Sequence, residues 1–349
     1  MENIIQKAGN VKLPVPSKRE FDAVSKRKKG SEITAFTYEK TNLPDKDRKA
    51  FKLRLCGKTL VYAENPAGGD PILISAMRCG LRFCPSCAWK RTHQIFHNVY
   101  NVITSREFSG KQFIFITLTI KNCKSEFLEN EIKRLLNGWQ KLTEGKRNDG
   151  FSKSFLGTFR ALEVTYNKLT GKYHPHLHAM AAVDPDYFRK SNKHYIGHER
   201  LIKLWRKACD LDYDPAVRIQ RVKETKGKQV AEVAKYTVKS ADYLNRPTVL
   251  ETLDPALKSK RLIAYGGLFR AVKKRLVLQD EEEMNEFPRL AVEELLRNPY
   301  IKKIALDWNM GNYHLRLIDP PADPTEWLDP GRLAAESLKR QAAAWSQEV

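Results

Sequence analysis

The sequence predicts an α+β protein with a central antiparallel sheet and a small cysteine-rich module. An apolar strand at 113–122 and a hairpin at 155–183 alternate in the manner of strands with two different faces. Segments at 128–142 and 199–208 carry apolar residues at helical spacing, so we expect helices on one face of the sheet and a polar site on the other. The third observation is a group of four cysteines between positions 56 and 87.

The charge of the chain indicates a polyanionic partner. Its 349 residues carry 62 basic against 41 acidic side chains, a formal net charge of +21, and an apolar content of 42% is enough for a real core. Such an excess favours nucleic acid, bound through phosphate contacts and release of counterions. The sequence has no strongly amphipathic cationic helix with a broad apolar face, which disfavours a protein of the membrane surface.

We expect a cytoplasmic protein of two or three structural units. No apolar run approaches about 18 residues, and the segment at 1–7 lacks a signal-peptide core. In that compartment thiols stay reduced, so the cysteines are expected to be metal ligands or buried thiols and not disulfides.

Four regions are predicted along the chain. Residues 1–50 are polar and lysine-rich and form an N-terminal arm, either flexible or in contact with DNA or a partner. Residues 51–92 form the cysteine module and residues 93–250 the sheet domain. Residues 251–349 are a C-terminal extension, a second candidate for binding DNA or a partner.

The cysteine module has the spacing of a structural zinc site. Cys84 and Cys87 form a Cys-x-x-Cys knuckle, Cys79 lies five residues upstream, and Cys56 can supply a fourth thiolate from the end of a hairpin. Four thiolates complete the closed tetrahedral shell of zinc. The rival interpretation is a redox Cys-x-x-Cys pair, against which the two additional cysteines argue.

The hairpin at 155–183 carries a second candidate metal site. His176 and His178 alternate along a strand, so both imidazoles point to the same face. If Leu169 and Thr170 centre the turn, Glu163 lies opposite His176 and completes a site of two histidines and one carboxylate with open positions. A slip of one residue would put Glu163 on the other face. The alternatives are ordinary surface histidines and a surface ion pair of Glu163.

A predicted helix at 230–244 places reactive side chains one turn apart. Glu232 and Tyr236 are four residues apart and Lys239 follows three residues later, all on one face. Tyr243, seven residues after Tyr236, lies on nearly the same face and is a competing nucleophile. Another helix is predicted at 88–104, with His93 and His97 on its solvated face.

Three motifs, in this order, resemble those of rolling-circle plasmid replication initiators. They are Phe115-Ile116-Thr117-Leu118-Thr119, His174-Pro175-His176-Leu177-His178 and Glu232-x-x-x-Tyr236-x-x-Lys239. The match is to the single-tyrosine Rep family of Gram-positive plasmids, within the HUH endonuclease superfamily, and covers roughly residues 50–280. The cysteine segment at 79–91 and the glycines at 266–267 also look like that family. Two-tyrosine members have a second tyrosine where this chain has Glu232.

The resemblance implies a ferredoxin- or RRM-like HUH core and a DNA-nicking reaction. Tyr236 is expected to form a 5′-phosphotyrosine and free a 3′-OH primer, with Glu232 as general base for the terminating hydrolysis. A Mn²⁺ or Mg²⁺ ion is expected on His176, His178 and Glu163. Phosphate or DNA contacts are expected from the following residues: His174, Lys235, Lys239, Thr119 and Lys121.

The resemblance also implies partners: single-stranded or hairpin origin DNA, a host helicase and polymerase, and a second copy in a homodimer. Three alternatives stay open. One is a related HUH relaxase or transposase, and another is a non-catalytic zinc-ribbon protein that binds nucleic acid. The third, a zinc deaminase, is disfavoured because its His-x-Glu signature is missing and the cysteines come before the histidines.

Overall fold

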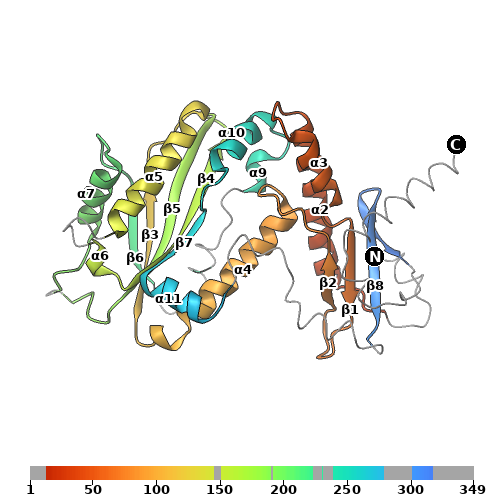
Figure 1. Cartoon of the computed structure of the whole chain (residues 1–349), viewed down its shortest axis with the longest axis horizontal. Coiled ribbons are helices and arrows are strands. Elements are labelled where there is room, and N and C mark those ends of the chain that lie inside the picture. Colours follow the sequence, from red (N-terminus) through yellow and green to blue (C-terminus); the bar gives the residue numbers. More distant parts are fainter. Residues whose placement is uncertain are drawn as a thin grey trace. The chain divides into compact units, whose positions relative to one another are not determined.

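The computed structural model describes residues 13–144, 151–189, 192–222, 230, 239–278 and 301–316. It has two compact units (Figure 1). The first comprises Met1–Ala88 and Glu282–Val349, and the second comprises Trp89–Glu281. The boundaries between these units, after Ala88 and after Glu281, differ from the predicted boundaries at 50, 92 and 250. The predicted C-terminal extension, residues 251–349, is divided between the two units.

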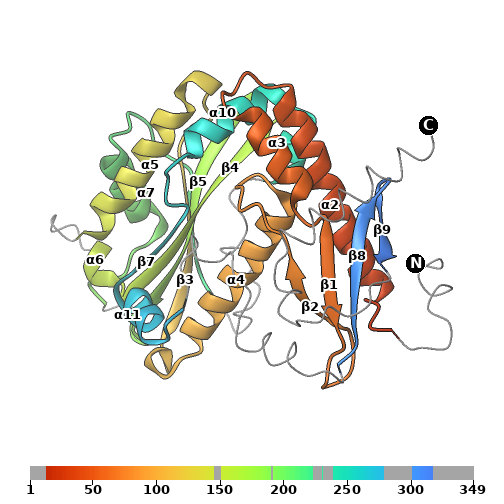
Figure 2. The ribbon, with the colours of Figure 1, turned by 45° about the vertical axis from the view of Figure 1, so that its right-hand side comes forward.

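The first unit is built on a four-stranded antiparallel sheet of order β2-β1-β8-β9 (Figure 2). Its strands are β1 (Thr59–Ala63), β2 (Ile72–Ala76), β8 (Lys303–Asn309) and β9 (Asn312–Arg316). All five residues of β1 are buried, and β2 and β8 pair with its two edges. Segments from both ends of the chain therefore form one sheet.

Two helices precede this sheet, α2 (Lys18–Glu39) and α3 (Lys46–Leu55). Ser17 caps α2, since its hydroxyl accepts a hydrogen bond from the backbone N–H of Glu20. Phe21 and Val24 of α2 enter the core cluster of the sheet together with Tyr62. Much of the segment assigned to an N-terminal arm is thus a helix with a buried face, because its few apolar residues recur at helical spacing.

The second unit contains a five-stranded antiparallel sheet of order β6-β3-β5-β4-β7. Its strands are β3 (Gln112–Thr119), β4 (Gly157–Asn167), β5 (Lys172–Val183), β6 (Val217–Arg221) and β7 (Ile263–Gly266). The predicted apolar strand is β3 and the predicted hairpin is β4–β5, so the expectation of an antiparallel sheet in an α+β protein is confirmed.

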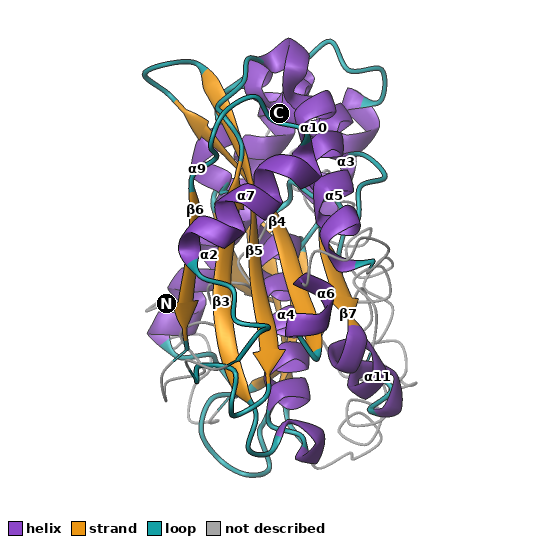
Figure 3. Ribbon diagram, turned by 90° about the vertical axis from the view of Figure 1, so that its left-hand side faces the viewer, coloured by secondary structure: helices purple, strands orange, loops and turns teal. Residues whose placement is uncertain are grey.

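Helices lie on both faces of this sheet. Helices α5 (Leu128–Thr143) and α7 (His198–Cys209) cover one face, whereas α4 (Pro85–Ile103) lies on the opposite one (Figure 3). Helices α5 and α7 pack closely at Gly138 of α5. A side chain at this position would collide through its Cβ with the Cys209 thiol of α7. The sequence predicted helices on a single face, and α4 is the departure from that expectation.

Shorter elements complete the second unit. They are η1 (Arg106–Phe108), η2 (Ser125–Phe127), α6 (Phe151–Ser154), α9 (Ser240–Tyr243), α10 (Pro247–Leu257) and α11 (Gly267–Arg275). Gly267, at φ +53°, lies against the backbone of Gly157, and a Cβ on either residue would come within 2.6 Å of a backbone atom. In the part of the chain that the structure describes, no helix is long and apolar enough to cross a membrane.

Candidate metal centres and active site

The turn of the β4–β5 hairpin fixes which side chains face each other. The Oδ1 of Asn167 accepts hydrogen bonds from the N–H groups of Leu169 and Thr170, at 2.9 and 3.2 Å. Gly171 follows at φ +65°. Pairing then runs from the turn along both strands, and Glu163 lies opposite His176. The predicted register is confirmed.

This register gathers three metal-ligating side chains on one face of the sheet. The Oε2 of Glu163 lies 3.3 Å from the Nε2 of His176 and 3.1 Å from the Nε2 of His178. The three donor atoms lie within 4.8 Å of one another, and Glu163 is only 5% exposed. Two imidazoles and a carboxylate can hold a divalent cation and leave coordination positions open for a substrate. We call this group the His/Glu cluster.

The hydrogen bond on the far side of His176 favours a cation between these groups. Its Nδ1 lies 3.1 Å from the carbonyl oxygen of His174, which can only accept, so Nδ1 carries the proton. The Nε2 of the ring then carries a lone pair, and this lone pair faces the Oε2 of Glu163. Two acceptors in contact require a positive charge between them, supplied by a proton or a metal ion. The donor set therefore fits a divalent cation.

His178 is held in a similar manner by β3, the neighbouring strand. Its Nδ1 lies 3.2 Å from the Thr117 hydroxyl, and its ring stacks on Phe115 with centroids 5.6 Å apart. Outer contacts of this kind orient metal ligands. Thr117 is a contact that the sequence motifs did not single out, although the register of β3 and β5 places it directly opposite His178. Alternation along the predicted strand was the signal that could have found it.

The ionisation of Glu163 is decided by its two histidines. Burial opposes the charged form, but hydrogen bonds and electrostatic attraction from His176 and His178 outweigh it. Together they hold the pKa of Glu163 well below its usual range. The carboxylate is thus ready as an anionic ligand. His174 is adjacent, with its ring centroid 4.9 Å from that of His176, and burial followed by the nearby His176 charge lowers its pKa.

The other predicted contact residues have partners of their own. The Nδ1 of His174 is hydrogen-bonded to the Oδ1 of Asn122. The hydroxyl of Thr119 donates to the carbonyl of Ala216 at 2.7 Å. The ammonium of Lys121 lies 3.9 Å from the ring centroid of Tyr213, a cation–π contact.

One residue of the third motif reaches the His/Glu cluster. The Nζ of Lys239 lies 3.9 Å from the Oε1 of Glu163, and its side chain is 62% exposed. Glu232, Lys235 and Tyr236, with most of the predicted helix at 230–244, lie outside the described residues. Tyr243, the competing nucleophile, is in α9 and only 1% exposed, so it is a core residue.

The four cysteines form a second, closed cluster in the first unit. The Sγ of Cys56 lies 3.5 Å from that of Cys84 and 3.6 Å from that of Cys87, and the Sγ of Cys79 lies 3.7 Å from that of Cys87. A tetrahedral zinc with bonds of about 2.3 Å would separate its sulfur ligands by about 3.8 Å. The spacing therefore fits one ion. Cys56 is the C-cap of α3 and lies at the end of the β1–β2 hairpin, as predicted, because the N–H of the next residue, Gly57, donates to the carbonyl of Met77 at 2.8 Å.

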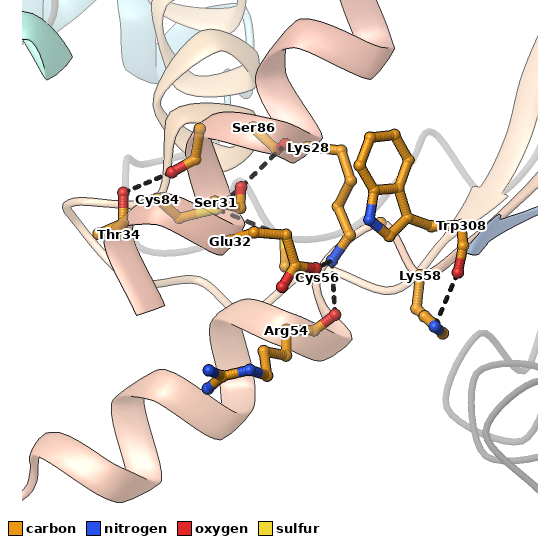
Figure 4. Close-up of polar contacts among 12 residues, drawn as sticks. Lys28, Ser31, Glu32, Thr34, Arg54, Cys56, Lys58, Cys84, Ser86 and Trp308 are labelled. Carbon is orange, nitrogen blue, oxygen red and sulfur yellow. Dashed lines mark hydrogen bonds and ion pairs between the residues drawn. The ribbon is translucent and has the colours of Figure 1, made fainter. Parts of the chain in front are cut away.

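Helix α2 supplies outer contacts to the four-cysteine cluster (Figure 4). The Ser31 hydroxyl lies 3.3 Å from the Cys84 sulfur and 3.4 Å from the Ser86 hydroxyl. Lys28, with no exposed surface, donates from Nζ to the carbonyl of Arg54, next but one to Cys56, and pairs with Glu32 at 2.6 Å. Lys28 thus ties α2 to the end of α3 beside the cluster, with its charge neutralised by Glu32.

Arg78 is a largely buried cation that interacts with the cysteines. Burial acts to lower its pKa, but the negative charge of Cys56 and Cys87 outweighs burial and raises it. Hydrogen bonds from Cys56, Cys79 and Cys84 hold the pKa of Cys87 well below its ordinary value. Among the described residues there are thus two candidate metal centres, one closed by four thiolates and one open on the face of a sheet.

A protein with these two centres has relatives among bacterial replication proteins. The family model Rep_1, described as "Replication protein", matches residues 72–315. The chain belongs to this family.

Individual relatives agree with the family match. A "Protein rep" of a Bacillus species is 36% identical over 269 residues, which cover 70% of this chain and 86% of the relative. A "Protein rep" of Bacillus amyloliquefaciens is 34% identical over 285 residues, which cover 73% of this chain and 82% of the relative. A "Protein rep" of Streptococcus pneumoniae is 32% identical over 238 residues, which cover 66% of this chain and 73% of the relative. No solved structure matches the chain.

Proposed function

We propose that this replication protein starts rolling-circle replication of a plasmid by nicking one strand at the double-strand origin. The observation that carries the proposal is the His/Glu cluster, in which two imidazole Nε2 atoms converge on one carboxylate oxygen at 3.3 and 3.1 Å. Membership of a replication protein family favours this reaction over a relaxase, a transposase or a non-catalytic zinc ribbon. The five-stranded sheet is proposed to be an HUH core.

Tyr236 is the proposed nucleophile. The phenol loses its proton and its oxygen attacks the scissile phosphate, so that a bond from this oxygen to phosphorus forms. The bond from phosphorus to the 3′-oxygen breaks, and the departing 3′-oxygen takes up a proton. The products are a 5′-phosphotyrosine and a free 3′-OH primer. A free phenol has a pKa near 10, so the nucleophile needs activation and the phosphate needs charge neutralisation.

The residues around the scissile phosphate have separate proposed roles. His176, His178 and Glu163 would hold a divalent cation, which supplies charge neutralisation at the phosphate oxygens. Imidazole ligands favour Mn²⁺ over Mg²⁺. Lys239, three residues after Tyr236 in the sequence, contacts Glu163 at 3.9 Å, which supports a role in binding phosphate. Lys235, His174, Thr119 and Lys121 are the further proposed contacts to phosphate or DNA.

Glu232 is proposed to end a replication round. It would accept a proton from the water that cleaves the last phosphodiester, so that the strand is released by hydrolysis. A second tyrosine at this position would instead accept the strand and start another round. One glutamate and one tyrosine therefore suit a single round of replication.

The other parts of the chain have proposed supporting roles. The four-cysteine cluster is proposed to bind a structural Zn²⁺, and the net charge of +21 suits a substrate of single-stranded or hairpin origin DNA. The predicted regions 1–50 and 251–349 are candidates for binding DNA or a partner. A host helicase, a polymerase and a second copy of the chain are the proposed partners in the cytoplasm.

The test is the covalent adduct. Full-length protein is incubated with Mn²⁺ and single-stranded oligonucleotides tiled across the replicon that carries the gene, and DNA-linked protein is resolved on a denaturing gel. One oligonucleotide is expected to form an adduct that survives SDS, and Tyr236→Phe is expected to abolish it. The matched control is Tyr243→Phe, a buried tyrosine seven residues away, which should retain the adduct. Failure of every oligonucleotide, or an adduct that persists in Tyr236→Phe, contradicts the proposal.

A further inference from the structure

Helix α4 exposes aromatic rings where a surface helix ordinarily carries charged side chains. Its 19 residues, Pro85–Ile103, include no aspartate or glutamate. Ile95 and Val99 are buried on one face, whereas Trp89 and Tyr100 are 39% and 43% exposed. The helix thus has an ordinary core face and an unusual solvent face.

The rings of the solvent face are arranged in two pairs. Trp89 and His93 have centroids 4.3 Å apart, and Phe96 and Tyr100 lie 6.0 Å apart with planes inclined by only 14°. Successive members are three or four residues apart in the sequence, so they follow one face over about 16 Å at 1.5 Å per residue. We call these four side chains the aromatic row.

We propose that the aromatic row binds single-stranded DNA by stacking of its bases, and this inference rests on the proposed nicking function. Every base has a π-face, so a row of rings binds an unpaired strand without reading its sequence. The charge of the helix is complementary to phosphate, because Arg91 accompanies the rings and the helix carries no acidic side chain. A duplex cannot use this row, since its bases are already stacked on one another.

The aromatic row belongs to the helix on the same side of the sheet as the His/Glu cluster. Helix α4 lies opposite α5 and α7 (Figure 3). Phe108, just after α4, packs on Phe113 with ring centroids 5.7 Å apart, and Phe113 shares a face of β3 with Thr117, the partner of His178. A strand held on α4 therefore lies on the side of the sheet where cleavage is proposed.

A surface depression continues the row beyond its C-terminal end. It has a volume of about 520 Å³ and is lined in part by Thr104 of the segment after α4, Arg106 and Arg275. Both arginines pair with Glu107, at 3.8 and 2.7 Å, so two positive charges face one negative charge. The remaining positive charge suits a phosphate of the same strand.

The test is DNA binding by the full-length protein, measured by fluorescence anisotropy with a labelled oligothymidine of about 20 nucleotides. Trp89→Ala and Tyr100→Ala are each expected to weaken binding about tenfold. The slope of log affinity against log salt should stay unchanged, because neither substitution removes a charge. Trp89→Phe and Tyr100→Phe keep a ring and should bind within about twofold of the parent.

Two controls make the result specific. Phe127→Ala removes a ring that is 54% exposed in η2, on another element, and should leave the affinity unchanged. Photo-crosslinking of the unsubstituted protein to 4-thiothymidine DNA should label the peptide that contains Trp89 to Thr104. This measurement decides the matter even if an alanine variant fails to fold.

Unchanged affinity in both alanine variants, or crosslinks confined to other peptides, overturns the inference. The inference is also overturned if the alanine variants lose self-association of the protein but keep their affinity for DNA, since the row is then a protein interface. The outcome is separable from the nicking test, which uses origin DNA and Tyr236. If the covalent adduct forms but the alanine variants of the aromatic row bind DNA normally, only this inference is overturned. If the alanine variants weaken DNA binding but no covalent adduct forms, only the nicking function is overturned.

Discussion

Thr59 and Asp307 are 248 residues apart in the chain and are joined by a hydrogen bond of 2.7 Å between neighbouring strands. The carboxylate of Asp307 also accepts from the Nε of Arg316 at 2.7 Å and from its Nη2 at 2.9 Å. This network connects β1 to β8 and β9, so that the first unit depends on a segment near the end of the chain. The four-cysteine cluster is in the same unit.

Asp307→Ala is expected to destabilise the first unit by about 3 kcal/mol, because it leaves the nearly buried Arg316 guanidinium without its carboxylate. The measurement is amide hydrogen exchange resolved by peptide, since a chain of two units need not unfold in one step. Protection should fall in β1 and β8. Glu39→Ala is the comparison, because it breaks an exposed ion pair with Arg54. It should lower the free energy of unfolding by less than about 1 kcal/mol. Undiminished protection of β1 in Asp307→Ala would disprove the dependence.

Ser31→Ala is expected to speed release of a metal ion loaded into the four-cysteine cluster about tenfold, because it removes the hydroxyl that contacts the Cys84 sulfur. Transfer of the ion to a chromophoric chelator gives the rate, and elemental analysis gives the ion and its stoichiometry. Thr37→Val is the control on the same helix, since that hydroxyl donates to the carbonyl of Ile33 in its own helix at 2.7 Å. Equal release rates in the two variants would show that α2 has no influence on the cluster.

Glu163→Gln is expected to weaken Mn²⁺ binding at the His/Glu cluster at least about tenfold, because a neutral amide replaces the anionic ligand between two imidazoles. Electron paramagnetic resonance of free Mn²⁺ measures the affinity without DNA. Thr117→Val should have a smaller effect in the same direction, since it frees only the far side of His178. Glu129→Gln, at an exposed glutamate paired with Lys133, serves as the control. Mn²⁺ affinity that survives Glu163→Gln would exclude this carboxylate as a ligand.

Cys123 and Cys209 are expected to resist alkylation in the folded protein. Burial raises the pKa of Cys123 to about 11 and that of Cys209 to about 12. A raised pKa lowers the fraction of reactive thiolate, to about one in a thousand for Cys123 at pH 8, against roughly one in four for a free cysteine. The rate of iodoacetamide labelling should rise about tenfold per pH unit between 8 and 10. Mass spectrometry follows both sites, with unfolded protein as the reference, and rapid labelling of folded Cys209 would contradict the expectation.

The sequence predicted the features that depend on local spacing. Alternation along the hairpin and the turn residues around Leu169 placed Glu163 opposite His176, because a strand has a side-chain period of two and a short turn fixes the register. The thiolates of Cys79, Cys84 and Cys87 were assigned to one cluster for a similar reason, since their short spacing limits where the chain can go. The order of three short motifs indicated the family that the comparisons show.

By itself, then, the sequence determined the α+β class, the two sets of candidate metal ligands and the family of the protein. Only the tertiary structure decided that β8 joins β1, that Ser31 of a lysine-rich helix touches Cys84, and that α4 turns Trp89 and Tyr100 to solvent. The physical reason is that periodicity reports which face of an element is apolar but not which distant element covers it. That choice is made by burial and close packing over the whole chain.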